Sequence, residues 1–488
     1  MSEGASSGVA AAAGGRSTGR AHLALLLAVL GVLLLAAWLR HAAETAAGPR
    51  YEGVSLGEWL RLAASENPRD RLTAELALGH IGPEALPTLI RAVEARDSWL
   101  WRQWQVMRTK VFKRPARTSP RPALNRVAAR SLAHLGPAAS NAAPAVLRWG
   151  SRQDGDQFEA ARALRAMGTA AAPCLVEALQ ARDPRLRLTA AQIAADPVFR
   201  PAAAALQPGL LKLLEDGSAE SRMAAIHTLT VLCPEDRAVS ARLAALLSPP
   251  DPRTVEAVLR ALTVFGRLAG EFAGRIEPFL AAPEPQVRLA AAQALYALRP
   301  PAPEAVPVLI QLLRDPRYQW EAARSLGKMG TNAVLAIEEL LAQLERTPTH
   351  RPSRTPSFAA LALRQMSPDA VPRLVRLLDH PASEVRINAA TALAGHGAAA
   401  APAVPGLIRM LGAEDPEEQM TAANTLGALG NTAREALPAL ERLARLETTQ
   451  DVVVGHVRSA ARAALTNITR TSRGKVPTQS SALPTQPN

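Results

Sequence analysis

The sequence of 488 residues predicts an all-α protein in which about eleven stacked helix pairs follow one transmembrane helix. Three observations predict this architecture. Apolar helical patterns recur roughly every 31–36 residues, the first helix of a pair ends in glycine, and a proline opens the second helix. The composition is that of a folded chain, because 48% of the residues are hydrophobic, 20% are charged and 3% are aromatic.

The chain begins with a polar stretch and a long apolar segment. Residues 1–20 are rich in Ala, Gly and Ser and are predicted to be disordered. Residues 21–39 contain no Asp, Glu, Lys or Arg, and as a helix they would span the roughly 30 Å hydrocarbon core of a membrane. Trp38 and Arg40 suit the headgroup boundary. We predict a signal anchor over 21–39 and a linker over 40–54, with a cleaved signal peptide as the alternative.

The charges beside this anchor do not decide its orientation. Arg16 and Arg20 precede the apolar segment, and Arg40 and Arg50 follow it, so the positive-inside comparison is a tie. A single span in front of one long domain usually acts as a signal anchor. We therefore expect the repeat domain to be exported.

Glycines mark the ends of the first helices in the predicted solenoid, which covers residues 55–469. A left-handed backbone at the C-terminal cap of a helix costs glycine least. The glycines at these positions are Gly82, Gly136, Gly168, Gly266, Gly330, Gly397 and Gly430.

Prolines and capping residues mark the helix starts. Proline suits the first position of the second helix, where its missing N–H loses no hydrogen bond. These prolines are Pro87, Pro144, Pro173, Pro405 and Pro438. First helices are expected to begin after a capping aspartate followed by proline. These aspartates are Asp183, Asp251, Asp315 and Asp415. Ser55 and Glu58 form a capping box that opens the solenoid.

The repeat resembles a known family. Two segments carry the resemblance, DPEEQMTAANTLGALG at 415–430 and PEPQVRLAAAQALYAL at 283–298. They resemble HEAT repeats in the short bacterial form named after phycobilisome-lyase-like (PBS lyase) repeats, whereas the signatures of tetratricopeptide and ankyrin repeats are absent. The resemblance implies a right-handed α-solenoid. Together with the anchor it favours a single-pass protein of a bacterial inner membrane, and it says little about chemistry.

The sequence contains no recognisable catalytic motif. None of the nine histidines is followed by Glu, so the resemblance does not extend to the His-Glu iron site of deoxyhypusine hydroxylase. The zinc-protease, phosphate-loop and nucleophile-elbow motifs are absent. Cys174 and Cys233 lie in apolar runs and are interpreted as small buried residues. We predict a non-catalytic protein with no cofactor and no metal.

The net charge of +13 is concentrated in one part of the chain. Residues 98–153 contain eleven Lys or Arg and no Asp or Glu, and the charges of the rest nearly cancel. The overall charge is therefore no argument for nucleic-acid binding.

The most unusual part of this segment is an insertion at 98–122, which contains three of the seven tryptophans. As a helix it would have an apolar stripe opposite a basic face. The stripe would consist of Leu100, Trp104, Met107 and Val111. Either the stripe packs on the neighbouring repeats and the basic face is merely solvated, or the helix docks on anionic lipid or an acidic partner. The candidate binding residues are Trp99, Trp101, Arg102, Trp104, Arg108, Lys110, Lys113, Arg114 and Arg117.

These patterns predict a membrane-anchored HEAT-type scaffold that binds an unknown protein partner along its concave face. Two alternatives remain open. The first is an enzyme or enzyme-assembly factor related to lyase-type HEAT proteins, and the second is a binder of anionic lipid or polymer through residues 98–126. Nucleic acid is the least favoured partner, because an exported domain rarely meets it. Residues 470–488 are predicted to be a disordered tail.

Overall fold

The computed structural model describes residues 49–65, 67–97, 99–110, 119, 121–248, 251–346, 357–445 and 452–472. The chain divides into two compact units, Met1–Cys233 and Pro234–Asn488. Within the described ranges, no helix combines the length and the apolar character needed to cross a membrane. The predicted anchor at 21–39 and the predicted tail at 1–20 lie outside these ranges.

The first unit opens with a β-hairpin, formed by β1 (Arg50–Tyr51) and the antiparallel β2 (Val54–Ser55). Glu52 and Gly53 have φ values of 50° and 80°, as a tight two-residue hairpin turn requires. The indole N–H of Trp59 donates a hydrogen bond of 3.1 Å to a backbone carbonyl of the first strand. The last residues of the predicted linker are therefore folded against the helices that follow.

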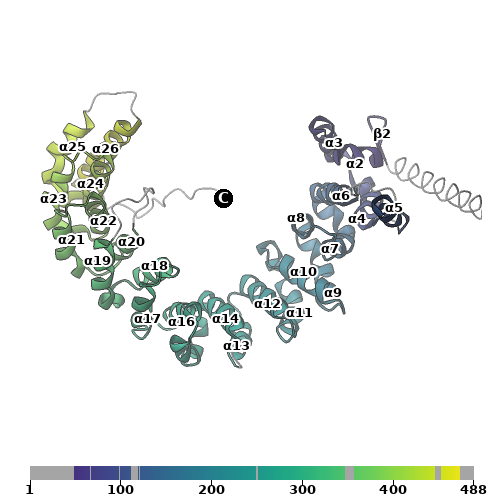
Figure 1. Cartoon of the computed structure of the whole chain (residues 1–488), viewed down its shortest axis with the longest axis horizontal. Helices are drawn as coiled ribbons and strands as arrows, with labels where there is room; N and C mark the ends of the chain where they lie inside the picture. Colours follow the sequence, from purple (N-terminus) through teal and green to yellow (C-terminus); the bar gives the residue numbers. More distant parts are fainter. Residues whose placement is uncertain are drawn as a thin grey trace, which may run out of the picture. The chain divides into compact units, whose positions relative to one another are not determined.

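The helices of the first unit alternate between two rows (Figure 1), and each first-row helix packs on the next one. The first row consists of α3 (Pro68–His80), α6 (Arg121–Leu135), α8 (Gln157–Met167), α10 (Pro184–Ala194) and α12 (Ala219–Leu232). The second row consists of α4 (Leu86–Glu94), α7 (Ala143–Gly150), α9 (Ala172–Leu179) and α11 (Ala203–Leu213). Two further helices stand outside the alternation, α2 (Leu56–Ala63) and α5 (Trp99–Lys110).

The second unit repeats this arrangement. Its first row consists of α14 (Pro252–Phe265), α16 (Pro285–Leu298), α18 (Gln319–Met329), α20 (Phe358–Leu363), α22 (Ser383–Leu393), α24 (Pro416–Leu429) and α26 (Val452–Ser472). Its second row consists of α13 (Arg237–Ala245), α15 (Ala273–Ile276), α17 (Ala305–Leu312), α19 (Ile337–Glu345), α21 (Val371–Leu377), α23 (Val404–Met410) and α25 (Leu437–Ala444). The last helix continues to Ser472, so the predicted tail begins later than residue 470.

Short 3₁₀ helices join many of these α-helices. They are η1 (Pro83–Ala85), η2 (Gly136–Ala142), η3 (Gly168–Ala171), η4 (Pro197–Ala202), η5 (Gly266–Phe272), η6 (Glu277–Ala281), η7 (Gly330–Ala336), η8 (Pro368–Ala370), η9 (Gly397–Ala403) and η10 (Gly430–Ala436). In chain order, a first-row helix is followed by a second-row helix eleven times in the described part of the chain. Apart from the hairpin, the described elements are helical, and each unit is an α-solenoid, as the sequence predicts.

Most of the predicted caps are confirmed. The side chains of Ser55, Asp183, Asp251 and Asp415 accept hydrogen bonds from backbone N–H groups at the starts of their helices. Asp315 is an exception, because α18 begins only at Gln319 and Asp315 instead caps the turn before it. The five prolines of the second helices occupy the second helical position, not the first, and there too the missing N–H loses no intrahelical bond.

Six of the seven glycines have the predicted positive φ, and five of these directly follow the end of a first-row helix, whereas Gly397 lies four residues after the end of α22 at Leu393. Gly136, Gly168, Gly266, Gly330, Gly397 and Gly430 have φ values between 50° and 62°. At Gly330 the ψ value is −125°, which lies outside the left-handed helical region and in one that side chains with a Cβ rarely enter. The prediction is wrong for Gly82, whose backbone is extended because the chain leaves α3 one residue earlier, at Ile81.

One of these turns contains a buried histidine. His396 is 8% exposed, and one of its ring nitrogens, Nε2, has no hydrogen-bond partner. Burial lowers the pKa of His396 below its ordinary value, an effect opposed by a hydrogen bond with the backbone of Leu363. The neutral ring therefore fits the folded state better than the charged ring does.

We expect a pH-dependent loss of stability from this histidine. Below about pH 6.5 the unfolded chain protonates His396 before the folded chain does, so the stability is complete above that pH and falls as the pH is lowered through 6.5 towards the folded pKa. His396→Gln should flatten the part of the pH dependence that comes from this residue. Urea unfolding of both proteins at pH 7.5 and pH 5.5 measures it, and an equal pH effect in both would refute this role of His396.

Candidate interaction surface

The predicted basic helix exists as α5, but only part of the insertion can be placed. The helix begins at Trp99 and ends at Lys110, whose side chain is exposed. Three candidate residues, and the side chain of a fourth, lie outside the described part of the chain. They are Lys113, Arg114 and Arg117, and the side chain of Arg102.

The predicted apolar stripe of α5 is described only in part: Met107 is half-buried, and the side chains of Leu100 and Val111 lie outside the described part of the chain. Trp104 belongs to that stripe, yet it is 43% exposed. Trp99 and Val106 are also exposed, at 65% and 47%. Trp101 and Arg108, which are not part of the predicted stripe, are half-buried like Met107. Helical periodicity alone could not select the inner face, because tryptophans and basic residues occur on both sides of this helix.

Some positive charges of the basic stretch at 98–153 are balanced by acidic residues from other parts of the chain. Arg130 forms an ion pair of 2.6 Å with Glu159, and Arg148 forms one of 2.7 Å with Glu94. Arg152 donates to the backbone carbonyl of Glu94 at 3.2 Å, and burial lowers its pKa. Both acidic residues lie outside the stretch in sequence. Counting charges along the chain therefore overstates the basicity of this surface.

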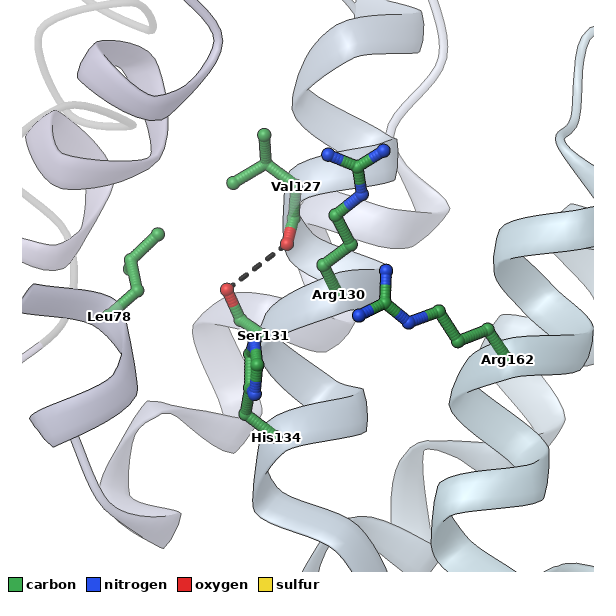
Figure 2. Close-up of a pocket in the computed structure, with 6 residues that line it drawn as sticks. All are labelled: Leu78, Val127, Arg130, Ser131, His134 and Arg162. Carbon is green, nitrogen blue, oxygen red and sulfur yellow. Dashed lines mark hydrogen bonds between the residues drawn. The ribbon is translucent and has the colours of Figure 1, made fainter. Parts of the chain in front are cut away.

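A cavity of about 110 Å³ lies between α3, α6 and α8 (Figure 2). Its lining combines a buried apolar side with basic side chains. Leu78 and Val127 are buried, whereas Arg162 and His134 are exposed. The lining residues are Leu78, Val127, Arg130, Ser131, His134 and Arg162.

Two arginines of this cavity share one buried carboxylate. Arg130 donates from Nε and Nη2 to Oε1 of Glu159, at 2.8 and 2.6 Å. The Nη1 atom of Arg162 lies 3.9 Å from the other carboxylate oxygen, Oε2, which is buried and has no hydrogen-bond partner. The side chain of Glu159 is 6% exposed, and those of the two arginines are 42% and 50% exposed. Two positive charges against one negative charge leave the cavity with a preference for an anion.

An exposed aromatic residue stands beside this cavity. Phe158 is 75% exposed and precedes Arg162 by one helical turn on α8. On α6, the exposed Arg126 precedes Arg130 by one turn. The α6–α8 surface, as we name it, consists of Arg126, Arg130, His134, Phe158 and Arg162. The sequence analysis missed this surface. Its signal was the four-residue spacing of the basic residues on α6, but the pairing with Glu159 is visible only in three dimensions.

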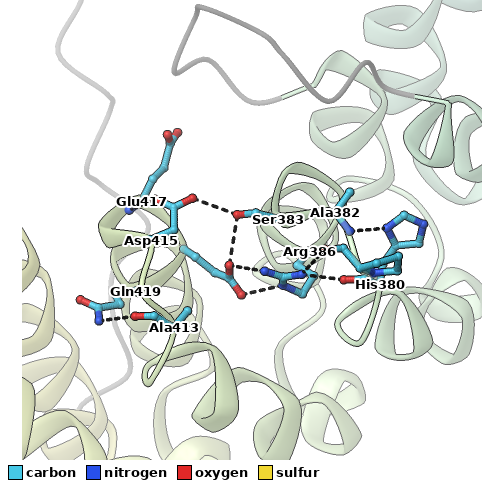
Figure 3. Close-up of polar contacts among 10 residues, drawn as sticks. His380, Ala382, Ser383, Arg386, Ala413, Asp415, Glu417 and Gln419 are labelled. Atoms are coloured by element: carbon cyan, nitrogen blue, oxygen red, sulfur yellow. Dashed lines mark hydrogen bonds and ion pairs between the residues drawn. The ribbon is translucent and has the colours of Figure 1, made fainter.

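Another group of arginines is structural. Arg386 on α22 donates from Nε and Nη2 to both carboxylate oxygens of Glu418 on α24, each at 2.7 Å (Figure 3). Its Nη1 donates to the carbonyls of His380 and Pro381, at 2.7 and 2.9 Å. The bond to Glu418 raises the pKa of Arg386. This side chain therefore joins one helix pair to the next and is not available to a ligand.

The same use of arginine recurs along the chain. Arg187, Arg222 and Arg288 each donate from Nη1 to carbonyl groups that follow the preceding second-row helix. Such carbonyls lack intrahelical partners and attract positive charge. Each arginine follows the start of its helix by about one turn. This spacing is a sequence signal that the analysis of glycine and proline overlooked.

Cysteines and metal-binding residues add no site in the described ranges. Cys174 is half-buried and Cys233 is buried, and neither forms a disulfide. Burial raises the pKa of the Cys174 thiol to about 11, so the sulfur is protonated and weakly nucleophilic at neutral pH. Within those ranges no group of three or more His, Cys, Asp or Glu side chains could hold a metal ion.

Comparison with known families finds one matching family model, in the second unit. The family model of HEAT repeats matches residues 275–351 and 371–466. These residues carry HEAT repeats, and they include the whole of both segments, 283–298 and 415–430, on which the resemblance rests. No curated protein matches the chain.

Several solved structures are similar to this chain. Kap121p bound to Ste12p is 13% identical, with a TM-score of 0.46, over 85% of this chain and 53% of that chain. Kap121p bound to Nup53p is also 13% identical, with a TM-score of 0.46, over 86% and 54%. Kap95p with RanGDP is 14% identical, with a TM-score of 0.42, over 87% and 62%. The chain thus spans about half the length of Kap121p.

Proposed function

We propose that this protein is a membrane-anchored, non-catalytic HEAT-repeat scaffold that binds another protein through its first-row helices. The α6–α8 surface is the observation that carries the proposal. It combines an exposed aromatic ring with an arginine pair whose charge is only half balanced. Aromatic and arginine side chains dominate the binding energy of protein interfaces. A partner that brings an acidic side chain would supply the missing negative charge.

The size of the cavity agrees with such a partner. A volume of about 110 Å³ equals roughly four water molecules, which is enough for the end of an Asp or Glu side chain. The apolar wall formed by Leu78 and Val127 suits the methylene groups of that side chain.

The other parts of the proposal rest on the sequence. The apolar segment 21–39 supports the anchor, and the missing catalytic motifs support a role without chemistry. The short repeat supports the phycobilisome-lyase-like form of HEAT repeat. Together with the anchor, it supports a location in a bacterial inner membrane with the repeat domain exported.

We expect the double variant Phe158→Ala/Arg162→Ser to reduce the yield of a specific partner at least fivefold in affinity capture from solubilised membranes. Losing an aromatic contact and a charged contact costs about 1 kcal/mol or more in a typical interface. The matched control is Leu335→Ala/Arg376→Ser, which removes an exposed apolar and an exposed basic side chain from the second unit. Quantitative mass spectrometry compares the three captures. An identical protein profile from all of them would contradict the proposal.

Binding to anionic lipid through α5 is the second candidate function. The observation that favours it is that Trp99, Val106 and Lys110 share the exposed face of this helix, close in sequence to the predicted anchor.

We expect that replacing the basic residues of the insertion by Ser weakens co-sedimentation with phosphatidylglycerol vesicles at low salt. The chain used begins at residue 49, so that the anchor cannot mask the effect. The replaced residues are Arg102, Lys110, Lys113 and Arg114. Co-sedimentation should weaken because each basic residue near an anionic surface contributes about 1 kcal/mol of attraction. The matched control replaces the exposed residues Arg253, Arg267, Arg275 and Arg376. Equal binding of the two variants would rule out a role of the insertion.

A further inference from the structure

Helix α18 in the second unit has an exposed stripe of aromatic and basic side chains. Trp320, Arg324 and Lys328 follow one another at four-residue spacing, and all three are exposed, Trp320 by 49%. The Cζ atom of Arg324 lies 5.2 Å from the centroid of the Trp320 ring, which is a cation–π contact. The two side chains therefore support each other while remaining open to solvent.

Close packing fixes the position of the neighbouring helix α20. A Cβ added at Gly327 would lie 3.1 Å from Cα of Ala362, and one added at Gly330 would lie 3.4 Å from the carbonyl oxygen of Gln365. Each contact joins a residue to one that follows it by 35 positions. The two helices therefore run side by side in the same direction.

This register places one exposed residue of α20, Leu361, beside the stripe. Leu361 is 39% exposed, and it lies level with the turn between Arg324 and Lys328. Arg364, the C-cap of α20, is exposed but its side chain packs towards Gly395 of the next repeat and does not belong to the stripe. The α18–α20 surface, as we name it, consists of Trp320, Arg324, Lys328 and Leu361.

One carboxylate lies on the same helix as the positive charges of this surface, that of the half-buried Glu321, which precedes Arg324 by three residues and forms no ion pair with it. In the described part of the chain, neither Arg324 nor Lys328 forms an ion pair. The carboxylate of Asp315, just before the helix, is already bound by Arg317 at 2.8 Å. On the other flank, α16 contributes a neutral contact, since the hydroxyl of Tyr296 donates to the backbone carbonyl of Lys328 at 2.9 Å. The surface thus attracts anions.

The spacing of the stripe selects an extended peptide. Residues four apart on a helix are about 6 Å apart along its axis, and alternate residues of an extended chain are about 6.6 Å apart. Two acidic residues separated by one residue therefore match Arg324 and Lys328. An apolar side chain two positions before them would lie against Trp320.

We infer that the α18–α20 surface binds an extended acidic segment of a partner protein with the pattern apolar-x-acidic-x-acidic. This inference rests on the proposed function, because it names the chemistry of one partner segment of the scaffold. The surface of an anionic membrane fits less well. A helix that lies on a membrane has its apolar and basic side chains on separate faces, whereas on α18 they lie in one line along the helix.

Fluorescence anisotropy of a labelled peptide tests the inference on the full chain in detergent. The probe carries Leu-Ser-Glu-Ser-Glu between short Ser-Gly flanks, and its control carries Gln in place of both Glu residues. We expect saturable binding of the acidic probe and at least tenfold weaker binding of the control. The double variant Arg324→Ser/Lys328→Ser should weaken binding at least tenfold and Trp320→Ala at least fivefold, whereas Trp320→Tyr should retain most of it.

The matched control protein is again Leu335→Ala/Arg376→Ser, which should bind the probe like the wild type. Far-UV circular dichroism verifies that each variant is folded. Absent binding, equal binding of the Gln peptide, or equal binding by the Arg324→Ser/Lys328→Ser variant would overturn the inference. If capture of a partner through the α6–α8 surface persists in that case, only the inference fails and the proposed function stands.

Discussion

Replacing Glu418 with alanine should destabilise the second unit by about 2–4 kcal/mol, because it breaks a nearly buried ion pair between two helix pairs. The side chain of Glu418 is 3% exposed, and it accepts two hydrogen bonds from Arg386 and one of 3.1 Å from Ser383. The guanidinium of Arg386 is only 23% exposed. Without its partner it would remain largely buried with an unbalanced charge.

A double variant separates the ion pair from general damage to the packing. In Arg386→Met/Glu418→Leu both charges are replaced by apolar side chains of similar size, and we expect it to recover most of the lost stability. Amide hydrogen exchange in α22 and α24 is the suitable measurement, because it reports the local stability of the two helices that the pair joins. A single variant as stable as the wild type, or a double variant less stable than the single one, would contradict this role of the pair.

Replacing Gly427 with alanine should also destabilise the second unit, by about 1–3 kcal/mol, although alanine is normally the better residue inside a helix. Gly427 is buried on α24, and a Cβ there would lie 2.9 Å from Cα of Ala464 on α26. The obstacle is backbone, so the two helices would have to move apart.

Gly455 on α26 is the matched control, because a Cβ there would meet no atom within 4 Å. Gly455→Ala should therefore stabilise the helix by about 0.5–1 kcal/mol. Urea unfolding followed by hydrogen exchange in α24 and α26 measures both effects. The interpretation is wrong if the two substitutions change stability in the same direction.

Much of the fold could be predicted because the same local sequence signals recur in many of the repeats. Glycine at 136, 168, 266, 330, 397 and 430 marks a backbone geometry that few other residues adopt, and these signals do not depend on distant contacts. The predicted helix boundaries were wrong at two positions. Asp315 and Gly82 both sit in turns whose geometry depends on where the adjacent helix begins or ends. The hairpin at residues 50–55 is too short to show a strand pattern.

The candidate site could be predicted much less well. The composition of the insertion drew attention to α5, but the sequence could not show which face of that helix is buried. Glu159 illustrates the other difficulty. It lies 29 residues after Arg130 and outside the basic stretch, yet it accepts hydrogen bonds from that arginine. The same carboxylate also lies near Arg162, so one negative charge is shared by two arginines. Such pairing depends on the stacking of helices and leaves no trace in local spacing.

Site-specific photo-crosslinking tests most directly whether a partner protein docks on the first-row helices. A benzophenone amino acid replaces either Phe158 on α8 or the exposed Glu177 on α9, the second-row helix of the same pair. We expect a discrete crosslinked protein from position 158 and none from position 177. No crosslink from position 158, or the same products from both positions, would contradict docking on the α6–α8 surface.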